Sequence, residues 1–253
     1  MAAIDTIRTE NKYLLSVEEA WSLQRRLEAA LQRDPFCAEG PYPVRSLYYD
    51  TPDGADYVTK MDGAPSRRKI RLRTYDPGNS LCRLEMKEKR GDAQRKLSLP
   101  VSRQAADRLL DCDYSVLTRY MSHEEDSWQK EARGTNRKAV RFYTTMMLQG
   151  YRPATMVEYR RMAYVYPYAD VRITFDTDVR CSESDTDLFR RGPTAAYSAY
   201  PDLLLDGKVI LEVKFSGPTL PRFISKLLQP YHLTRTAVSK YVLSRPAAYE
   251  FIL

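Results

Sequence analysis

The sequence predicts an α+β protein: an eight-stranded antiparallel β-barrel that forms a tunnel, with helices packed on the outside. Two observations support this fold. Hairpins or long helical segments join the strand-like segments, and such connections favour antiparallel pairing. Charged residues recur two positions apart in most of these segments, so that one face of each strand carries charge. Eight strands can close around a space that holds one small ligand.

The predicted strands come first, because their alternation defines the sheet. They run over residues 8–15, 43–50, 68–75, 81–89, 95–101, 155–165, 170–179 and 208–215. A helix is predicted over residues 17–33, where Ser16 caps the first turn and Glu19 completes a capping box. The turn from Asp76 to Asn79 predicts a hairpin between two of the strands.

Helical spacing of apolar residues interrupts the strands twice. It covers residues 102–150 and residues 220–242, the second stretch being broken near Pro230. No internal repeat or low-complexity tract divides the chain. We therefore predict one domain over residues 1–253, with a helical insertion at about 102–150.

Composition limits the possible partners and the cellular location. The formal net charge is +7, which favours polyanionic partners such as nucleic acid, acidic lipid surfaces or phosphate-rich small molecules. No stretch approaches the ~20 apolar residues that span a bilayer, and the first residues lack a signal-peptide core. The four cysteines have no CxxC spacing, which is typical of reduced thiols in a cytoplasmic protein. Two histidines leave no zinc cluster and no Ser–His–Asp set.

Charges at every second strand position indicate a charged inner face beneath an apolar outer face. They are Glu10 and Lys12; Arg71 and Arg73; Glu85, Lys87 and Lys89; Arg172, Thr174 and Asp176; Glu212 and Lys214. Such a face is costly to bury unless a ligand or a counter-charge compensates it. The run Arg67–Arg68–Lys69 is expected at a tunnel mouth or in solvent.

The sign of this inner face indicates its ligand. Basic residues outnumber carboxylates, namely Lys12, Arg71, Arg73, Lys87, Lys96 and Arg172. A basic lining neutralises a polyanion, and arginine can bind two phosphate oxygens at once. The acidic residues, chiefly Glu212 and with it Glu10 and Glu85, could hold a divalent metal that bridges phosphate oxygens. The chain has no P-loop motif, which excludes that kind of nucleotide site.

Eight segments in register resemble one known family. They are RTENKY (8–13), SLYYDTPD (46–53), RKIRLRTYD (68–76), LEMKEK (84–89) with RKLSL (95–99), VEYRRMAY (157–164), VRITFDTDV (171–179), ILEVKF (210–215) and VSKY (238–241). In this order the chain resembles the vacuolar-transporter-chaperone (VTC) domain of the triphosphate tunnel metalloenzyme superfamily, also called CYTH-like. The resemblance implies an eight-stranded tunnel, ATP as phosphoryl donor, Mn²⁺ (or Mg²⁺) as cofactor, and inorganic polyphosphate as product.

The resemblance also implies roles for individual residues. Catalytic roles fall on Lys12, Arg71, Arg73, Lys87 and Arg172, phosphate binding falls on Lys96, Arg161, Lys240 and Lys60, and metal binding falls on Glu212. The family pattern favours Arg161 over Arg160 as the inward residue. Two positions depart from the pattern. Arg8 replaces the first glutamate of the superfamily's ExExK motif, which argues against a two-metal hydrolytic site, and Ala237 replaces a lysine of eukaryotic polymerases.

The predicted function is metal-dependent phosphoryl transfer from ATP to a growing polyphosphate chain in a basic tunnel. Alternatives are an inorganic or nucleoside triphosphatase with the same lining, and a non-catalytic module that binds polyphosphate or triphosphate. Charge alone also allows a nucleic-acid-binding protein, but the predicted partners are ATP and polyphosphate and not nucleic acid. Export of the product would require a separate membrane protein.

Overall fold

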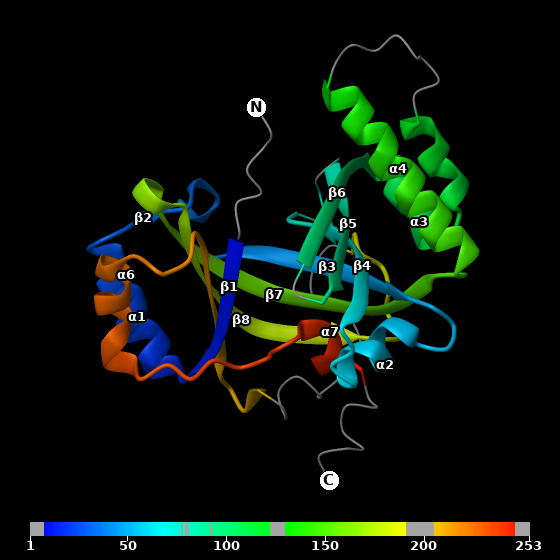
Figure 1. Ribbon diagram of the computed structural model, residues 1–253. Coiled ribbons are helices and arrows are strands. Elements are labelled where there is room, and N and C mark those ends of the chain that lie inside the picture. The colour runs from blue at the N-terminus through cyan, green and yellow to red at the C-terminus, as the bar shows by residue number, and fades with distance from the viewer. Residues whose placement is uncertain are drawn as a thin grey trace. The chain divides into compact units, whose positions relative to one another are not determined.

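The computed structural model describes residues 8–76, 78, 81–91, 93–121, 130–190 and 205–245 (Figure 1). The strands are β1 (Arg8–Leu15), β2 (Gln32–Arg33), β3 (Tyr42–Asp50), β4 (Ser66–Thr74), β5 (Leu81–Arg90), β6 (Ala93–Ser102), β7 (Arg152–Tyr166), β8 (Val171–Ser182) and β9 (Val209–Ser216). The α-helices are α1 (Val17–Glu28), α2 (Ala55–Met61), α3 (Arg103–Leu110), α4 (Lys130–Leu148), α6 (Arg222–Leu228) and α7 (Lys240–Leu243). The registers of β1 with β9, β9 with β8, β2 with β7, and β3 through β6 are all antiparallel. The α+β class and the antiparallel sheet are therefore confirmed.

The chain forms two compact units, which we call unit 1 and unit 2. Unit 1 comprises Met1–Pro43, Tyr159–Arg180 and Ala199–Leu243, and unit 2 comprises Val44–Glu158, Cys181–Ser198 and Ser244–Leu253. Strand β7 contributes its first half to unit 2 and its second half to unit 1. The prediction of a single domain stays a prediction.

Unit 1 has its own apolar core under two helices. Its strands follow the order β1, β9, β8, β7, with β2 on β7. Helix α1 begins at Val17 because the Ser16 hydroxyl accepts from the Glu19 N–H and the Glu19 carboxylate accepts from the Ser16 N–H, the predicted capping box. The helix buries Leu23 and Leu27 in this core, to which α6 also contributes. It ends at Glu28, earlier than predicted, because residues 32–33 pair with β7.

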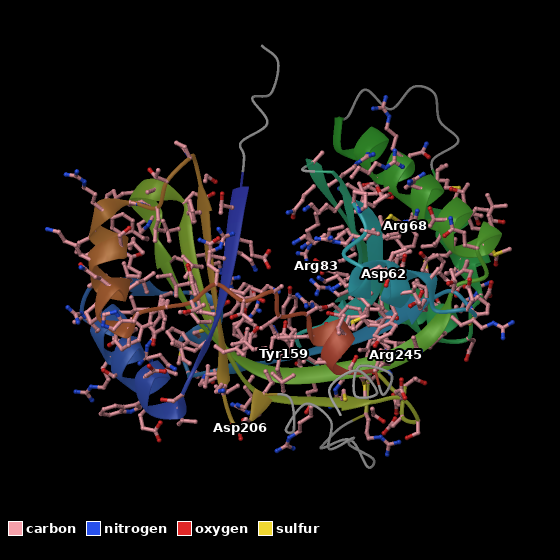
Figure 2. All side chains as sticks on the ribbon, turned by 60° about the horizontal axis from the view of Figure 1, so that its bottom comes forward. Asp62, Arg68, Arg83, Tyr159, Asp206 and Arg245 are labelled. Atoms are coloured by element: carbon pink, nitrogen blue, oxygen red, sulfur yellow. The ribbon has the colours of Figure 1, made fainter. Side chains whose placement is uncertain are left out.

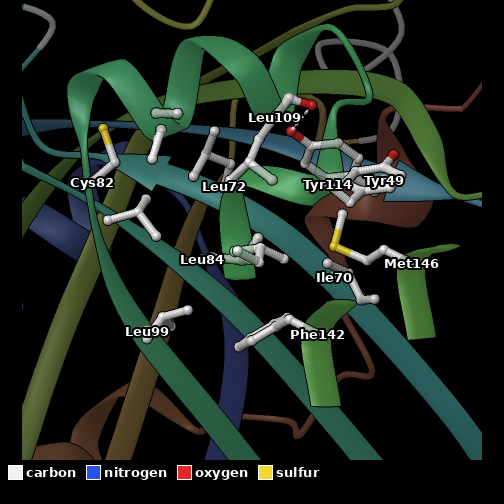
Figure 3. Close-up of a cluster of buried hydrophobic side chains, with 14 of the residues drawn as sticks. Tyr49, Ile70, Leu72, Cys82, Leu84, Leu99, Leu109, Tyr114, Phe142 and Met146 are labelled. Atoms are coloured by element: carbon white, nitrogen blue, oxygen red, sulfur yellow. Dashed lines mark hydrogen bonds between the residues drawn. The ribbon is translucent and has the colours of Figure 1, made fainter. Parts of the chain in front are cut away.

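Unit 2 has a second core between its strands and helices α3 and α4. Its strands follow the order β7, β3, β4, β5, β6. Ile70, Leu72 and Leu84 point from the sheet towards Phe142 of α4 and other apolar side chains of this core (Figure 3). The Tyr49 hydroxyl donates to the Leu109 carbonyl at 3.1 Å, so that a buried polar group keeps a partner.

The predicted strands agree with the structure except at a few boundaries. The predicted helical stretch over residues 220–242 is wrong in part, because residues 232–239 form an irregular segment between the 3₁₀ turn Gln229–Tyr231 and α7. All eight strands are present, and β4 and β5 form the predicted hairpin, although turn residues 77 and 79 lie outside the described part of the chain. The helical insertion consists of α3, a 3₁₀ segment (Tyr114–Tyr120) and α4. Sequence reasoning missed β2 and helix α2. The strand path runs from β1 to β6 in the described residues, and closure into a barrel stays a prediction.

Candidate functional site

One face of the sheet in unit 1 carries two rows of mostly charged side chains. Partners in the antiparallel register lie side by side, so Lys12 on β1, Glu212 on β9 and Thr174 on β8 form one row. The neighbouring row consists, in the same strand order, of Glu10, Lys214 and Arg172. The alternation seen in the sequence thus brings residues from three distant segments onto one surface.

Glu212 is a buried carboxylate surrounded by cations. Its Oε1 lies 3.4 Å from Lys12 Nζ and 3.3 Å from Lys240 Nζ. Its Oε2 lies 2.9 Å from Lys214 Nζ and 3.3 Å from Arg161 Nη2. Burial opposes ionisation of this carboxyl group, but the four cations outweigh burial and hold the pKa of Glu212 well below its ordinary value. Glu212 is therefore ionised at neutral pH.

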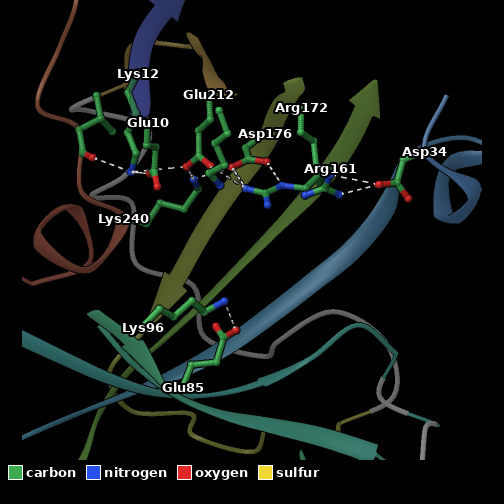
Figure 4. Close-up of polar contacts among 12 residues, drawn as sticks. Glu10, Lys12, Asp34, Glu85, Lys96, Arg161, Arg172, Asp176, Glu212 and Lys240 are labelled. Atoms are coloured by element: carbon green, nitrogen blue, oxygen red, sulfur yellow. Dashed lines mark hydrogen bonds and ion pairs between the residues drawn. The ribbon is translucent and has the colours of Figure 1, made fainter. Parts of the chain in front are cut away.

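Asp176 is the second acidic centre of this cluster (Figure 4). Arg161 donates to it through both Nε and Nη2, at 2.6 and 2.7 Å, and Lys240 Nζ lies 2.5 Å from its Oδ2. Asp176 is fully buried, and both cations also lie against the ring of Tyr159, at 5.2 and 4.7 Å from its centroid. Asp176 and Tyr159 thus set the positions of two residues that the sequence assigns to phosphate binding.

Two lysines of the cluster have opposite pKa shifts. Burial disfavours the charged form of Lys240, but Asp176 and Glu212 outweigh burial and raise its pKa. Burial prevails at Lys214, whose pKa is lowered although Glu212 accepts from it. Lys214 is therefore closer to losing its proton than Lys240.

Arg172 is held apart from the Glu212 cluster by other partners. Its Nη2 lies 2.9 Å from Asp34 Oδ2 and donates to the Tyr42 hydroxyl at 3.1 Å. Arg160 points outward and donates to the Pro41 carbonyl. The structure therefore buries Arg161 in the cluster and not its neighbour, as the family pattern predicts.

Glu85 is the acidic centre of unit 2. Arg71 donates to Glu85 Oε2 through Nε and Nη2 at 2.8 and 2.7 Å. Figure 4 shows the second contact, in which Lys96 Nζ lies 2.5 Å from Oε1. Arg73 Nη1 lies 3.9 Å from Oε2, and Arg73 Nε donates to the Ser46 hydroxyl. Burial raises the pKa of Glu85, but these three cations outweigh burial and lower it well below its ordinary value.

This face of β4, β5 and β6, which we call the basic face, lies opposite the apolar core of unit 2. It carries eight basic residues and one acidic residue, namely Arg67, Lys69, Arg71, Arg73, Arg83, Lys87, Lys89 and Lys96 with Glu85. In Figure 2, Arg68 lies on the side of the strands that α4 covers, whereas Arg83 lies on the other side. Four predicted residues, Arg71, Arg73, Lys87 and Lys96, therefore share one surface. Lys60 lies on helix α2 and not on these strands.

The chemistry of the donor set bears on the predicted metal. Within the described residues, no three His, Cys, Asp or Glu side chains are close enough to hold an ion. Both oxygens of Glu212 face ammonium or guanidinium groups, which would repel a divalent cation. The described arrangement does not fit a metal held by protein ligands alone. Mn²⁺ or Mg²⁺ at Glu212 stays a prediction.

Comparison with known families decides the classification. The VTC domain family matches residues 7–249, nearly the whole chain. The chain belongs to this family. The resemblance of the eight sequence segments is thereby confirmed.

One curated relative of this VTC domain is vacuolar transporter chaperone complex subunit 4 from Schizosaccharomyces pombe. The two are 28% identical over 225 residues, and the match covers 78% of this chain and 30% of the relative. The chain thus corresponds to less than a third of that protein's length.

Solved structures with low sequence identity are also similar. A candidate adenylate cyclase from Vibrio parahaemolyticus has a TM-score of 0.48 at 13% identity, covering 95% of this chain and 99% of that one. A candidate adenylate cyclase from Bacillus halodurans has a TM-score of 0.48 at 14% identity, covering 92% and 94%. Neither likeness bears on the activity of this VTC domain.

Sequence reasoning named Glu85 and Glu212 but missed Asp34, and it assigned no cationic partners to Asp176. Asp34 follows no strand alternation, and its place beside Arg172 depends on the loop before β3. Asp176 was visible as part of an alternating polar strand, but its two cationic partners lie on β7 and α7.

No helix in the described residues is long and apolar enough to cross a membrane. The predicted cytoplasmic location stays a prediction.

Proposed function

We propose that this VTC domain transfers phosphoryl groups from ATP to a growing inorganic polyphosphate chain. The observation that carries the proposal is the basic face of unit 2, where eight basic residues lie on one face with a single carboxylate and three of them contact it. Membership of the VTC family and the relative named as a vacuolar transporter chaperone subunit support the same chemistry. A surface of this kind neutralises several phosphate groups at once and offers arginines that can bind phosphate oxygens in pairs.

The side chains would act by position and charge. Arg71 and Arg73 would hold the triphosphate of ATP, and Lys87 and Lys96 would draw the end of the acceptor chain to the same face. A terminal phosphate oxygen of the chain attacks the γ-phosphorus, the bond from that phosphorus to the β–γ bridging oxygen breaks, and ADP leaves. Phosphoryl transfer depends mainly on alignment and charge neutralisation, so no nucleophilic Ser, Cys or His is needed.

The cluster around Glu212 and Asp176 in unit 1 contains further residues that are predicted to bind phosphate, but these residues already contact carboxylates. Lys12, Arg161 and Lys240 contact phosphate only if they exchange some of their contacts with Glu212 and Asp176. A bound divalent ion would supply Lewis-acid charge neutralisation. A triphosphate would have to provide the ligands that the described residues do not supply around Glu212.

The products formed from ATP test the proposal. The purified protein is incubated with ATP and Mn²⁺, and the products are resolved on a gel. A ladder of lengthening chains is expected. Free phosphate without a ladder would indicate a triphosphatase, and no turnover with retained tripolyphosphate binding would indicate a binding module. Either result overturns the proposed transfer.

A matched pair of variants tests the surface itself. Arg73→Ala removes a cation from the basic face, whereas Arg95→Ala removes an exposed cation from the opposite face of β6. Arg73→Ala should weaken tripolyphosphate binding by roughly 1–3 kcal/mol, the range for a charge-assisted hydrogen bond. Arg95→Ala should leave binding unchanged. Duplex DNA should compete poorly with tripolyphosphate at equal phosphate concentration, and equal competition would favour a nucleic-acid surface.

A further inference from the structure

Tyr75 is an exposed aromatic residue at one end of the basic face. It follows β4 two positions beyond Arg73, so that it continues the series of same-face residues Arg71 and Arg73. The Arg73 guanidinium lies 5.9 Å from the centroid of the Tyr75 ring, which places the ring beside this arginine. Tyr75 is 38% exposed, so this end of the basic face presents an aromatic surface to solvent.

The two arginines proposed to hold the triphosphate each lie near a tyrosine ring, but the two rings differ in exposure. The Arg71 guanidinium lies 5.9 Å from the Tyr48 ring and donates to the Tyr48 hydroxyl at 3.2 Å. Tyr48 is buried and supports Arg71 from β3. Tyr75 has a similar relation to Arg73, yet its side chain reaches the surface, where a ligand can contact it.

The backbone around Tyr75 is fixed by the residues on either side of it. The Thr74 hydroxyl donates to the Asp76 carbonyl at 2.7 Å, and the Asp76 N–H donates to the same hydroxyl at 3.3 Å. The Asp76 carboxylate accepts from the Gly78 N–H at 2.8 Å, so this acid is engaged in the hairpin turn. Because the backbone is held in this way, Tyr75 loses less freedom when a ligand stacks on its ring.

An exposed ring next to phosphate-binding arginines suits the base of a nucleotide. A nucleobase stacks on an aromatic side chain through its flat face, whatever hydrogen-bonding groups it carries. Inorganic tripolyphosphate and polyphosphate have no such face. Same-face residues on a strand lie about 7 Å apart, so Tyr75 lies one step beyond the arginines that would hold the phosphates. A contact with Tyr75 would therefore distinguish a nucleoside triphosphate from a bare phosphate chain.

We infer that Tyr75 is a specificity-determining residue on which the base of the phosphoryl donor stacks. This deepens the proposed function, on which it rests, because it orients the donor on the basic face. With the base at Tyr75, the α-phosphate lies beside Arg73 and the γ-phosphate lies farther along β4 and β5. The γ-phosphate then faces Lys87 and Lys96, the side chains to which the proposal assigns the acceptor chain.

Ligands with and without a base test this inference in matched variants. Tyr75→Leu removes the aromatic face, Tyr75→Phe keeps it, and Tyr168→Leu removes an 87% exposed tyrosine from unit 1. Titration calorimetry in the presence of Mn²⁺ measures binding of tripolyphosphate and of imido analogues of ATP and UTP, whose β–γ bridge resists transfer. Tyr75→Leu should bind the ATP analogue at least about fivefold more weakly, the factor that corresponds to ~1 kcal/mol of stacking. Tyr75→Phe and Tyr168→Leu should bind it as the wild type does, and all three variants should bind tripolyphosphate within about twofold of the wild type, because the arginines remain.

The size of the base gives a second readout. A purine has a larger stacking face than a pyrimidine, so the wild type should bind the ATP analogue more tightly than the UTP analogue, and Tyr75→Leu should bind the two alike. An equal loss of affinity for tripolyphosphate in Tyr75→Leu would show that the ring only supports Arg73, and would overturn the inference. Unchanged affinity of Tyr75→Leu for the ATP analogue would also overturn it. Both outcomes leave the proposed function standing, whereas a wild type that binds neither the ATP analogue nor tripolyphosphate would refute that function and the inference with it.

Discussion

The acidic centre of unit 1 and that of unit 2 hold their cations in different ways. Asp176 is fully buried, and the side chains of Arg161 and Lys240 beside it are each 7% exposed. In unit 2, Glu85 is 4% exposed, but its partners Arg71 and Lys96 are 26% and 55% exposed. Both centres hold basic residues that the sequence assigns to phosphate. Arg161 and Lys240 beside Asp176 are enclosed in the protein, whereas Arg71 and Lys96 beside Glu85 remain open to a ligand. Arg73, the third cation beside Glu85, is enclosed as well, at 7% exposed.

This difference implies two kinds of contribution to phosphate binding, one from each unit. A buried cation that contacts two carboxylates is positioned before any ligand arrives, but it can meet phosphate only at the expense of those contacts. A half-exposed cation adds charge to an approaching polyanion at little structural cost. We therefore expect substitutions in unit 1 to affect folding first and substitutions in unit 2 to affect binding first.

The largest effect is expected for Asp176→Asn. The change leaves Arg161 and Lys240 with one buried carboxylate fewer, and breaking a buried ion pair from one side costs about 3–5 kcal/mol. Chemical denaturation should show this loss in the free energy of unfolding. Asp34→Asn is the matched control, because Arg172 beside it is 27% exposed and can be solvated.

Phosphate binding separates positioning from simple destabilisation in the same variant. At a temperature where Asp176→Asn remains folded, the KM for ATP should rise more than kcat falls, because two ligands are misplaced while the basic face is intact. Similar losses of stability in Asp176→Asn and Asp34→Asn would contradict the distinction between enclosed and open cations.

A smaller loss of stability is expected for Glu85→Gln, together with a gain in affinity for tripolyphosphate. The buried carboxylate stabilises three cations, so the folded state should lose roughly 1–3 kcal/mol, the range for a hydrogen bond to a charged group. The same change leaves the basic face without its acid. Tripolyphosphate should therefore bind more tightly, and titration calorimetry can measure the gain. Weaker binding would show that Glu85 positions Arg71 and Arg73 for the ligand.

The sequence predicted the strands better than it predicted the ion pairs. Alternation places Arg71, Arg73 and Lys87 on one face whatever the loops do, so the basic face follows from the strand period and the hairpin. Lys240 and Asp34 lie outside the strands, and only the packing of the loops and of the short helix α7 brings them to their partners. Register between distant strands could not be predicted either, so the row of Lys12 and Glu212 required the structure.

The smallest predicted change in stability concerns Asp56, a carboxylate of unit 2 with no ion-pair partner in the described part of the chain. The Tyr151 hydroxyl donates to it at 2.8 Å, but burial and the charge of Asp50 raise its pKa to about 6. An unfolded aspartate titrates near 4, so between about pH 4 and pH 6 the folded state binds more protons than the unfolded state. Stability then falls as pH rises through this window, by at most roughly 3 kcal/mol at 1.36 kcal/mol per unit.

Asp56→Asn removes this titration and keeps an oxygen that can accept from Tyr151. The variant should be more stable than the wild type by about 1 kcal/mol at pH 7.5, since desolvation of the amide offsets part of the gain, and nearly equal to it at pH 4. Thermal unfolding across this range measures the difference. Glu85 has the opposite sign, because its cations lower its pKa and its contribution is lost only as the solution becomes acidic. A difference between Asp56→Asn and the wild type that does not change from pH 4 to pH 7.5 would show that Asp56 is ionised throughout, and that the nearby Arg68 and Lys69 neutralise it as the basic face neutralises Glu85.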